Sequence, residues 1–312
     1  MTLQQLRYVA EVAERKSISE AAERLFISQP SLSLAIREIE KETGTRIFAR
    51  TNRGVLVTTE GEEFLAYVRQ ALQQLDLLEA KYIAGTPSRQ KFSVSTQHYA
   101  FTSNAFVDLI REFGGEEYDF ALRETTTRAI IEDVRTMRSE IGVLYLSSFN
   151  ERVIARLLRE SGLEFRELFA VRPHIFVGKQ HPLAGRASVS PKELEGYPCL
   201  SFEQGEHNSL YFSEEALSTR DARKSIRVTD RAAVINLLIG LDAYLIATGV
   251  FPSDLHSKDI LPVPLEAEEI IRVGTVTRKD HIETPLGTAY MAALSRIADD
   301  VNRGGAGSGG MT

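Results

Sequence analysis

Apolar residues recur at gaps of three and four through the first 43 residues, a spacing typical of short amphipathic helices. Thr2 and Gln5 form a capping box for the first helix, and Ser28 is a favourable N-cap for the third. Pro30 in the first turn and Gly44 at the end mark the bounds of that third helix. We therefore expect helices over about residues 3–13, 19–25 and 28–43.

A polar, basic segment follows at residues 46–53, and a new helix begins near Thr59. Two short helices joined by a tight turn, then a basic segment and another helix, are the layout of a winged helix-turn-helix. In that module the second helix of the pair enters the DNA major groove. Glutamine can pair with adenine, serine can bond to several bases, and arginines of a wing suit phosphates or the minor groove. The expected DNA-binding residues are Ser28, Gln29, Pro30, Ser31, Ser33, Arg37, Arg50 and Arg53.

Residues 19–61 resemble the corresponding part of the LysR-type transcriptional regulators. The residues that carry the resemblance are Ala21-Ala22, Leu25, Ser28-Gln29-Pro30-Ser31-Leu32-Ser33, Ile36, Ile39-Glu40, Gly44, Phe48, Arg50, Arg53 and Thr58-Thr59-Glu60-Gly61. Thr43 and Glu60 depart from the residues usual in the family, and neither lies at a position that reads bases. The resemblance implies that Gln29, Pro30 and Ser33 contact bases, and it extends to the architecture downstream.

A longer amphipathic helix is expected next, with an apolar stripe that includes Phe64, Val68, Leu72, Leu75 and Leu78. An apolar stripe of this length is stable only when other apolar residues bury it. Either the core of the same chain covers it, or a partner helix pairs with it along a coiled-coil seam. The family resemblance favours the second explanation, a dimerisation helix that links the DNA-binding domain to the rest of the chain.

From Lys91 onward, strand and helix patterns alternate, an order typical of a mostly parallel sheet with helices on both faces. The resemblance implies a two-lobed α/β effector-binding domain like that of periplasmic binding proteins. The expected domains are a winged helix-turn-helix at 1–58, a linker helix at 59–86, an effector-binding domain at 91–302 and a flexible tail at 303–312. Within the effector-binding domain, lobe I is expected over 92–163 and 268–302, and lobe II over 164–267.

Ligands of open parallel sheets bind at the carboxyl ends of the strands, near helix N-termini. The candidate effector-binding residues at such ends are Ser95, Thr96, Gln97, His98, Tyr145, Ser147, Phe202, Glu203, Gln204 and Gly249. Donors near a helix N-terminus favour an anionic group on the effector. Sulfate, an amino acid and an aromatic acid would each fit. Glu203 does not suit an anion, and it can instead accept from a ligand amine or close on lobe I.

Simpler explanations are open for several of these residues. Ser28 can be a helix cap without a DNA contact, and Arg53 can be a solvated surface charge. Helix capping and ordinary loop polarity account for Ser95 and Thr96 as well as ligand binding does.

Net charge is -6 over 312 residues, which is unusual for a DNA-binding protein. The charge is uneven, because residues 1–60 carry +1 and the remainder carries -7. We therefore expect modest non-specific DNA affinity and more than one DNA-binding domain in each assembly. Cys199 is the only cysteine, so an intrachain disulfide is excluded and an inert buried thiol is expected. No apolar run is long enough for a membrane span and no signal peptide is present, which indicates a cytoplasmic, nucleoid-associated protein of a bacterium.

Enzyme signatures are missing: the six histidines lack zinc-site spacing, and neither a phosphate-binding glycine loop nor a nucleophile elbow occurs. The sequence predicts no catalytic activity, no metal and no cofactor beyond a small effector. A solute-binding protein without gene control is the alternative, and the N-terminal helix-turn-helix and the missing signal peptide speak against it. The expected partners are double-stranded promoter DNA with a dyad-related site, the effector, further copies in a homodimer or homotetramer and, for an activator, RNA polymerase. On this interpretation the effector binds between the lobes and alters DNA binding or bending.

Overall fold

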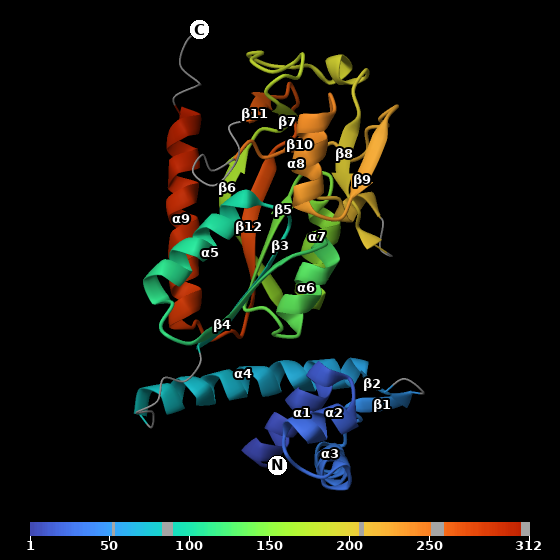
Figure 1. Ribbon diagram of the computed structural model, residues 1–312, viewed down its shortest axis with the longest axis vertical. Coiled ribbons are helices and arrows are strands. Elements are labelled where there is room, and N and C mark those ends of the chain that lie inside the picture. The colour runs from blue at the N-terminus through green and yellow to red at the C-terminus, as the bar shows by residue number, and fades with distance from the viewer. Residues whose placement is uncertain (52–53, 83–89, 206–208, 251–258, 307–312) are drawn as a thin grey trace. The chain divides into compact units, whose positions relative to one another are not determined.

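The computed structural model describes residues 1–51, 54–82, 90–205, 209–250 and 259–306 (Figure 1). They form two compact units, Met1–Gln90 with Thr136–Arg138, and the rest of the chain from Lys91. The expected fold class is confirmed: a winged helix-turn-helix and a long helix precede an α/β region with two sheets. Within the described ranges, no helix has the length and apolar character needed to cross a membrane.

The first unit contains the three short helices and the wing that the sequence predicts. Its elements are α1 (Leu3–Arg15), α2 (Ile18–Arg24), α3 (Gln29–Thr43), β1 (Phe48–Thr51), β2 (Gly54–Val57) and α4 (Thr59–Tyr82). Thr2 and Gln5 form the capping box of α1, Ser28 caps α3, and Gly44 ends α3 with a φ of +67°. The cap of α2 is Ser17, two residues before the predicted start at Ser19.

Small and branched apolar side chains from all four helices and the wing form the core of this unit. Ala21 and Ala22 of α2 are buried, and their small size lets α1 and α3 approach closely. The other fully buried positions include Val9, Val12, Leu32, Ile39, Ile47 and Leu65. Because each of these helices is too short to be stable alone, this shared core holds the three-helix arrangement in place.

The apolar stripe of α4 is covered in its first half by the chain's own core. Val68 is buried there, and Phe64 and Leu72 pack against the same cluster. Val68 therefore has almost no surface left for the predicted seam with a partner helix, whereas Phe64 and Leu72 are half-buried and their dimerisation role stays a prediction. Leu75 is half-buried, while Leu78 is 51% exposed. A dimerisation role for the second half of α4 stays a prediction.

Lobe I is built on one five-stranded sheet in the order β4-β3-β5-β12-β6. Its strands are β3 (Gln90–Thr96), β4 (Tyr118–Glu124), β5 (Ile141–Leu146), β6 (Leu163–Val171) and β12 (Ile271–Arg278). Its helices are α5 (Ala100–Phe113), α6 (Thr127–Arg135), α7 (Glu151–Glu160) and α9 (Pro285–Ala306). Helix α9 continues into the region that the sequence assigns to a flexible tail, and residues 307–312 lie outside the described part.

Lobe II has a second five-stranded sheet, in the order β11-β7-β10-β8-β9. Its strands are β7 (His174–Gly178), β8 (Cys199–Phe202), β9 (Ser225–Val228), β10 (Tyr244–Ala247) and β11 (Ile260–Pro264). Helix α8 (Arg231–Gly240) packs on one face of this sheet through Val234 and Leu238.

Two expectations about these sheets are wrong. Strand β6 pairs antiparallel with β12, so residues 164–171 belong to lobe I and not to lobe II. The sheets are also mixed rather than mostly parallel: β12 runs antiparallel to both β5 and β6, and β7 runs antiparallel to β10 and β11. Strands β3 and β5 are the parallel pair that carries the predicted strand ends.

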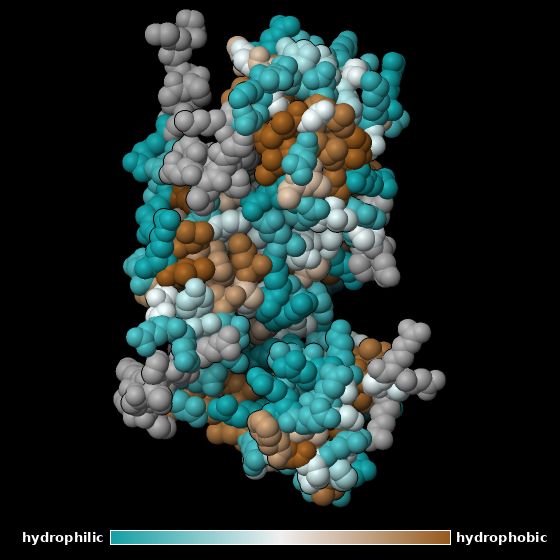
Figure 2. All heavy atoms as spheres, in the orientation of Figure 1, coloured by the Kyte–Doolittle hydropathy of each residue, from teal (hydrophilic) through white to brown (hydrophobic). Residues whose placement is uncertain are grey.

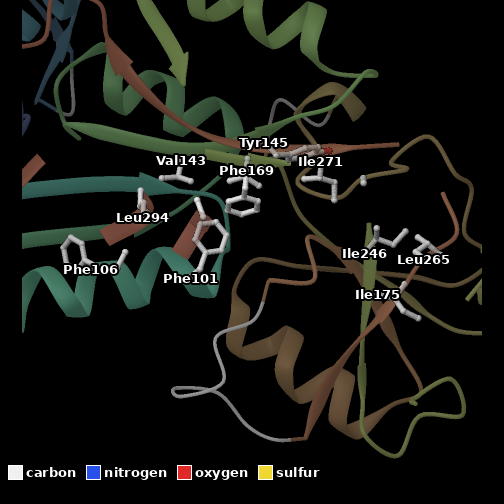
Figure 3. Close-up of a cluster of buried hydrophobic side chains, with 14 of the residues drawn as sticks. Phe101, Phe106, Val143, Tyr145, Phe169, Ile175, Ile246, Leu265, Ile271 and Leu294 are labelled. Atoms are coloured by element: carbon white, nitrogen blue, oxygen red, sulfur yellow. The ribbon is translucent and has the colours of Figure 1, made fainter. Parts of the chain in front are cut away.

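One continuous apolar cluster joins the two lobes (Figure 3). Lobe I contributes Phe101, Tyr145 and Phe169, and lobe II contributes Ile175 and Ile246. Each lobe therefore completes part of the other lobe's core, and this packing joins the two sheets.

Gly61 lies where the first turn of α4 meets the backbone of Ile47. A Cβ atom at Gly61 would lie 2.2 Å from the carbonyl oxygen of Ile47. We expect Gly61→Ala to destabilise the first unit by about 2 kcal/mol, because the two backbone segments must separate. Thermal unfolding should show a lower midpoint for this unit only. Glu60→Ala, at an exposed neighbouring position, is the matched control, and equal midpoints for both variants would contradict the packing argument.

Candidate functional site: a DNA-facing helix and an interlobe pocket

The amino end of α3 combines a capped turn with exposed polar side chains. The hydroxyl of Ser28 accepts a hydrogen bond from the Ser31 backbone N–H at 3.2 Å and lies 2.7 Å from the Ser31 hydroxyl. Ser28 and Ser31 therefore have a structural role that satisfies the start of the helix. Gln29, Pro30 and Arg37 are exposed and Ser33 is half-exposed, so these side chains can reach a DNA groove.

A carboxylate fixes the wing to this helix, and the sequence-based prediction missed it. Oε1 of Glu40 accepts hydrogen bonds from the backbone N–H groups of Ile47 and Phe48, at 2.8 and 3.0 Å. This bond pair sets where β1 starts relative to α3. Arg50 lies on β1, opposite Val55 of β2, but its side chain lies outside the described part, as does all of Arg53.

Phe26 is an apolar side chain in the turn between α2 and α3. It is 93% exposed, and its backbone has a φ of +54°. That conformation is uncommon for a bulky residue and costs about 1 kcal/mol relative to glycine. No pattern in the sequence identifies this position, because an apolar residue before Ser28 would be expected to pack inward.

The predicted strand ends do come together in the second unit, but several of their side chains are used internally. Gln97 is fully buried; its Nε2 donates to Thr127 Oγ1 at 2.6 Å, and its Oε1 accepts from the Tyr145 backbone N–H at 3.0 Å. Ser95 donates to Asp133 Oδ2 at 2.6 Å, and Thr96 donates to the Gln97 carbonyl oxygen. Both side chains are fully buried, and neither lines the two pockets described below, which favours their structural explanation.

The remaining candidates divide between structural and pocket positions. The Ser147 backbone N–H bonds to Asn150 Oδ1 at the start of α7, and Glu203 is exposed. Gly249 has a φ of +75°, and a Cβ there would meet the His174 ring at 2.5 Å. Of the other candidates, His98 and Phe202 line the pocket between the lobes, while Tyr145 donates to the Glu215 carbonyl oxygen and Gln204 donates to Glu214.

A carboxylate of the chain itself fills the position predicted for an effector anion. Oε2 of Glu214 accepts from the His98 backbone N–H at 3.0 Å and lies 2.8 Å from His98 Nδ1. Its Oε1 accepts from Gln204 Nε2 at 3.1 Å. The His98 ring is stacked on Phe202, with centroids 3.9 Å apart and planes 4° apart. His98 lies just before Tyr99, the N-cap of α5, which makes no side-chain cap bond, so the Glu214 carboxylate lies near the amino end of this helix.

Beside this carboxylate lies a mostly apolar pocket of about 60 Å³. It is lined by Tyr99, Ala100, Phe176, Val234, Ile235, Leu238, Leu245, Ile246, Ala247, Thr248, Val250, Ile260 and Ile271, with His98, Phe202, Glu214, Glu215 and Arg231 at its polar side. Apolar side chains gather on the surface over α8, which forms one wall (Figure 2). Arg231 of lobe II bonds to Glu124 of lobe I at 2.8 Å, so ion pairing also joins the lobes here.

Burial and neighbouring charges shift the pKa values of Glu215 and His98, which lie at the polar side of the pocket. Burial of Glu215, reinforced by the Glu214 charge, raises the pKa of Glu215 to about 7. Burial lowers the pKa of His98, but the hydrogen bond and charge of Glu214 outweigh it, so the pKa of His98 is raised overall. Within the ranges that the structure covers, no group of three metal-ligating side chains occurs.

Both the helix-turn-helix region and the two-lobed region match models of known protein families. The family model described as "Bacterial regulatory helix-turn-helix protein, lysR family" matches residues 3–62, and "LysR substrate binding domain" matches residues 98–298. The uncharacterized HTH-type transcriptional regulator YnfL of Escherichia coli K12 is 29% identical over 303 residues, covering 94% of this chain and 97% of its own length. The transcriptional dual regulator GltC of Bacillus subtilis is 29% identical over 297 residues, covering 91% of this chain and 93% of its own.

Two solved structures share the fold across nearly the whole chain. A full-length OxyR variant from Pseudomonas aeruginosa has a TM-score of 0.61 at 19% identity and covers 97% of this chain and 95% of that one. CbnR, described as a LysR family transcriptional regulator, has a TM-score of 0.54 at 17% identity, with 96% of this chain and 99% of that one covered.

The raised pKa values predict that the second unit loses stability as the pH rises. The pKa of Glu215 is about 7 in the folded chain and 4.5 for the ordinary side chain. A folded pKa above the unfolded one gives stability that is complete below the unfolded value and lost as the pH passes the folded value. The raised pKa of His98 acts in the same direction.

Melting curves should therefore show a lower midpoint for this unit at pH about 8 than at pH about 5. Glu215→Gln keeps the shape: its amide oxygen can accept from the Phe202 N–H as Oε1 does, and its amide nitrogen can donate to the Ser213 hydroxyl, which donates to Oε2 in the wild type. This variant should flatten the decline and raise the midpoint at the higher pH. Glu203→Gln, at an exposed position, should leave the decline unchanged. Parallel curves for wild type and Glu215→Gln would show that the pH dependence arises elsewhere.

Proposed function

Because this chain belongs to the LysR family of bacterial transcriptional regulators, we propose that it binds a dyad-related promoter site and that an effector entering between its lobes alters this binding. At the coarser level the chain is a DNA-binding transcriptional regulator with a substrate-binding domain, and it is not an enzyme. The observation that carries the proposal about the effector is the Glu214 carboxylate held by His98 between the two sheets.

Base recognition is proposed for Gln29, Ser33 and Arg37 of α3. All three lie on the outward face, since the inward face is occupied by Leu32, Ile36 and Ile39. Gln29 can make a bidentate pair with adenine, and Arg37 is long enough for guanine or a phosphate. Ser28 and Ser31 support this surface through their capping bonds rather than through base contacts.

The effector is proposed to be a carboxylic acid with an apolar part. Its carboxylate takes the place of the Glu214 carboxylate and accepts from the His98 N–H and ring, while its apolar part enters the pocket beside α8. Exchange of one carboxylate for another keeps the His98 backbone N–H and ring nitrogen hydrogen-bonded. A small anion such as sulfate would fill the same position but leave the apolar pocket without an occupant.

Displacement of Glu214 gives the effector unequal affinity for two states of the domain, which is the requirement for any ligand to shift an equilibrium. With Glu214 bound to His98, the segment that carries it is tied to lobe I; with Glu214 displaced, that tie is lost. We propose that this change alters how paired DNA-binding domains are spaced in a homodimer or homotetramer. In an activator, RNA polymerase would sense the altered complex.

The DNA-reading proposal predicts a selective loss. Gln29→Ala combined with Ser33→Ala should weaken binding to the chain's own operator by about 2–4 kcal/mol, because each good base contact contributes about 1–3 kcal/mol. Binding to unrelated duplex DNA should change little, since phosphate contacts supply it. Titration of both duplexes at one fixed salt concentration measures the difference. Glu20→Ala on α2 is the control, and equal losses on both duplexes would exclude a base-reading role.

The effector proposal predicts chemical rescue at the vacated carboxylate position. Glu214→Gly should lower the melting midpoint of the second unit by roughly 5 °C, because about 2 kcal/mol of charge-assisted hydrogen bonding is lost. Added propionate should restore part of the midpoint, while the neutral isostere propionamide should not. Wild type should respond less, as its own carboxylate competes. Equal effects of propionate and propionamide would refute an anion position at His98.

A further inference from the structure

Lobe II contains a second cavity, of about 400 Å³, beyond the pocket between the lobes. Its floor is formed by β8, β9 and β10, and its roof by the segment from Ser209 to Ala222. Its lining residues all come from lobe II. A volume of this size can hold a small organic molecule.

Arg220 is a cation in the wall of this cavity without a counter-charge. One end of its guanidinium, Nη2, donates to the Pro191 carbonyl oxygen. The other end, Nη1, is buried and has no hydrogen-bond partner among the residues that the structure describes. The described carboxylates form no ion pair with Arg220. A buried donor without a partner is unfavourable, and an anion in the cavity would satisfy Nη1 of Arg220.

The other charges in the wall favour a ligand with a single negative charge. Arg227 lies on β9 opposite Ser201 and adds a second cation, while Asp221 and Glu215 are acids in the same wall. The two cations and two acids nearly balance, so a doubly charged anion would meet repulsion without a second free cation. Hydroxyl groups of Ser201 and Tyr244 offer donors or acceptors beside Arg220.

We propose that this lobe II cavity binds a small monocarboxylate, whose oxygen accepts a hydrogen bond from Nη1 of Arg220. The site is separate from the His98–Glu214 position, so it does not rest on the proposed effector mechanism. It shares Phe202 and Glu215 with the interlobe pocket, which gives a bound monocarboxylate a physical link to that pocket.

Cys199 makes the proposal testable without any DNA measurement. It is the only cysteine of the chain and lines the cavity. Tyr244 lies opposite Cys199 in the sheet, and both residues line the cavity together with Arg220, so the thiol and the guanidinium face one space. Iodoacetate carries a carboxylate and iodoacetamide does not. In both reactions the sulfur displaces iodide from the CH2 carbon: the C–S bond forms, the C–I bond breaks, iodide leaves and the thiol proton goes to solvent.

The full chain is treated with each reagent, and alkylation of Cys199 is followed by mass spectrometry. We expect iodoacetate to react faster than iodoacetamide by about tenfold, since Nη1 of Arg220 can hold the iodoacetate carboxylate beside the thiol and raise its local concentration. The iodoacetate rate should saturate, and propionate should slow both reagents. Arg220→Gln should remove the preference, while Arg223→Gln, an exposed neighbour that does not line the cavity, should keep it.

Three results would overturn the proposal. One is the same ratio of rates in wild type and in a folded Arg220→Gln variant. The second is alkylation of Cys199 that propionate does not slow, which would mean that no small carboxylate binds beside the thiol. The third is equal protection by phosphate and propionate, which would replace the monocarboxylate class by a general anion site. If Arg220→Gln fails to fold, propionate protection of wild-type Cys199, compared with propionamide, decides between the outcomes.

Discussion

The effector-binding domain depends on one interaction: the Glu214 carboxylate of lobe II accepts from the His98 backbone N–H of lobe I and lies against the His98 ring nitrogen. The carboxylate is nearly inaccessible to water, with a side chain 3% exposed, and it is held by His98 and Gln204. A buried carboxylate without such partners would be strongly unfavourable. Because His98 belongs to lobe I and Glu214 to lobe II, the bonds that satisfy this carboxylate also join the two lobes.

Neighbouring features follow from this carboxylate. Glu215 is next in the chain and is also buried, so its charged form is disfavoured by burial and by Glu214 together. The Phe202 ring stacks on His98 and keeps the imidazole in line with the carboxylate. Arg231 and Glu124 add an ion pair between the lobes at the edge of the apolar pocket. The polar contacts between the lobes and the apolar pocket therefore lie side by side, an arrangement that suits an acid with a hydrocarbon part.

Local patterns in the sequence predicted the local structure well. Helical spacing, the capping box at Thr2 and the stop at Gly44 are short-range signals, and the structure has each of them. The strand ends at Gln97 and Tyr145 were also placed correctly at one edge of the lobe I sheet. What a single sequence could not supply was long-range pairing. Glu214 lies 116 positions from His98, in a segment without a periodic pattern, so nothing local marked it.

The incorrect predictions for Val68 and for residues 164–171 also arose because long-range contacts are not visible in one sequence. Val68 belongs to a genuine apolar stripe, but a stripe alone does not say whether the chain or a partner covers it. Residues 164–171 were assigned to lobe II because β7 follows within three residues, whereas their partner in the sheet is β12, about 100 positions away. Glu40 was treated only as part of a family motif, and its role became visible in its bonds to the start of the wing.

The position of β12 has a consequence for biosynthesis. This strand lies between β5 and β6 in the lobe I sheet, although it follows every strand of lobe II in the sequence. Synthesis from the amino end therefore makes all of lobe II, whose strands lie between His174 and Pro264, before it makes β12. Strands β5 and β6 have no direct pairing with each other, so the lobe I sheet can be completed only once Ile271–Arg278 has been synthesised. In a growing chain, the lobe that begins first is thus the lobe that closes second.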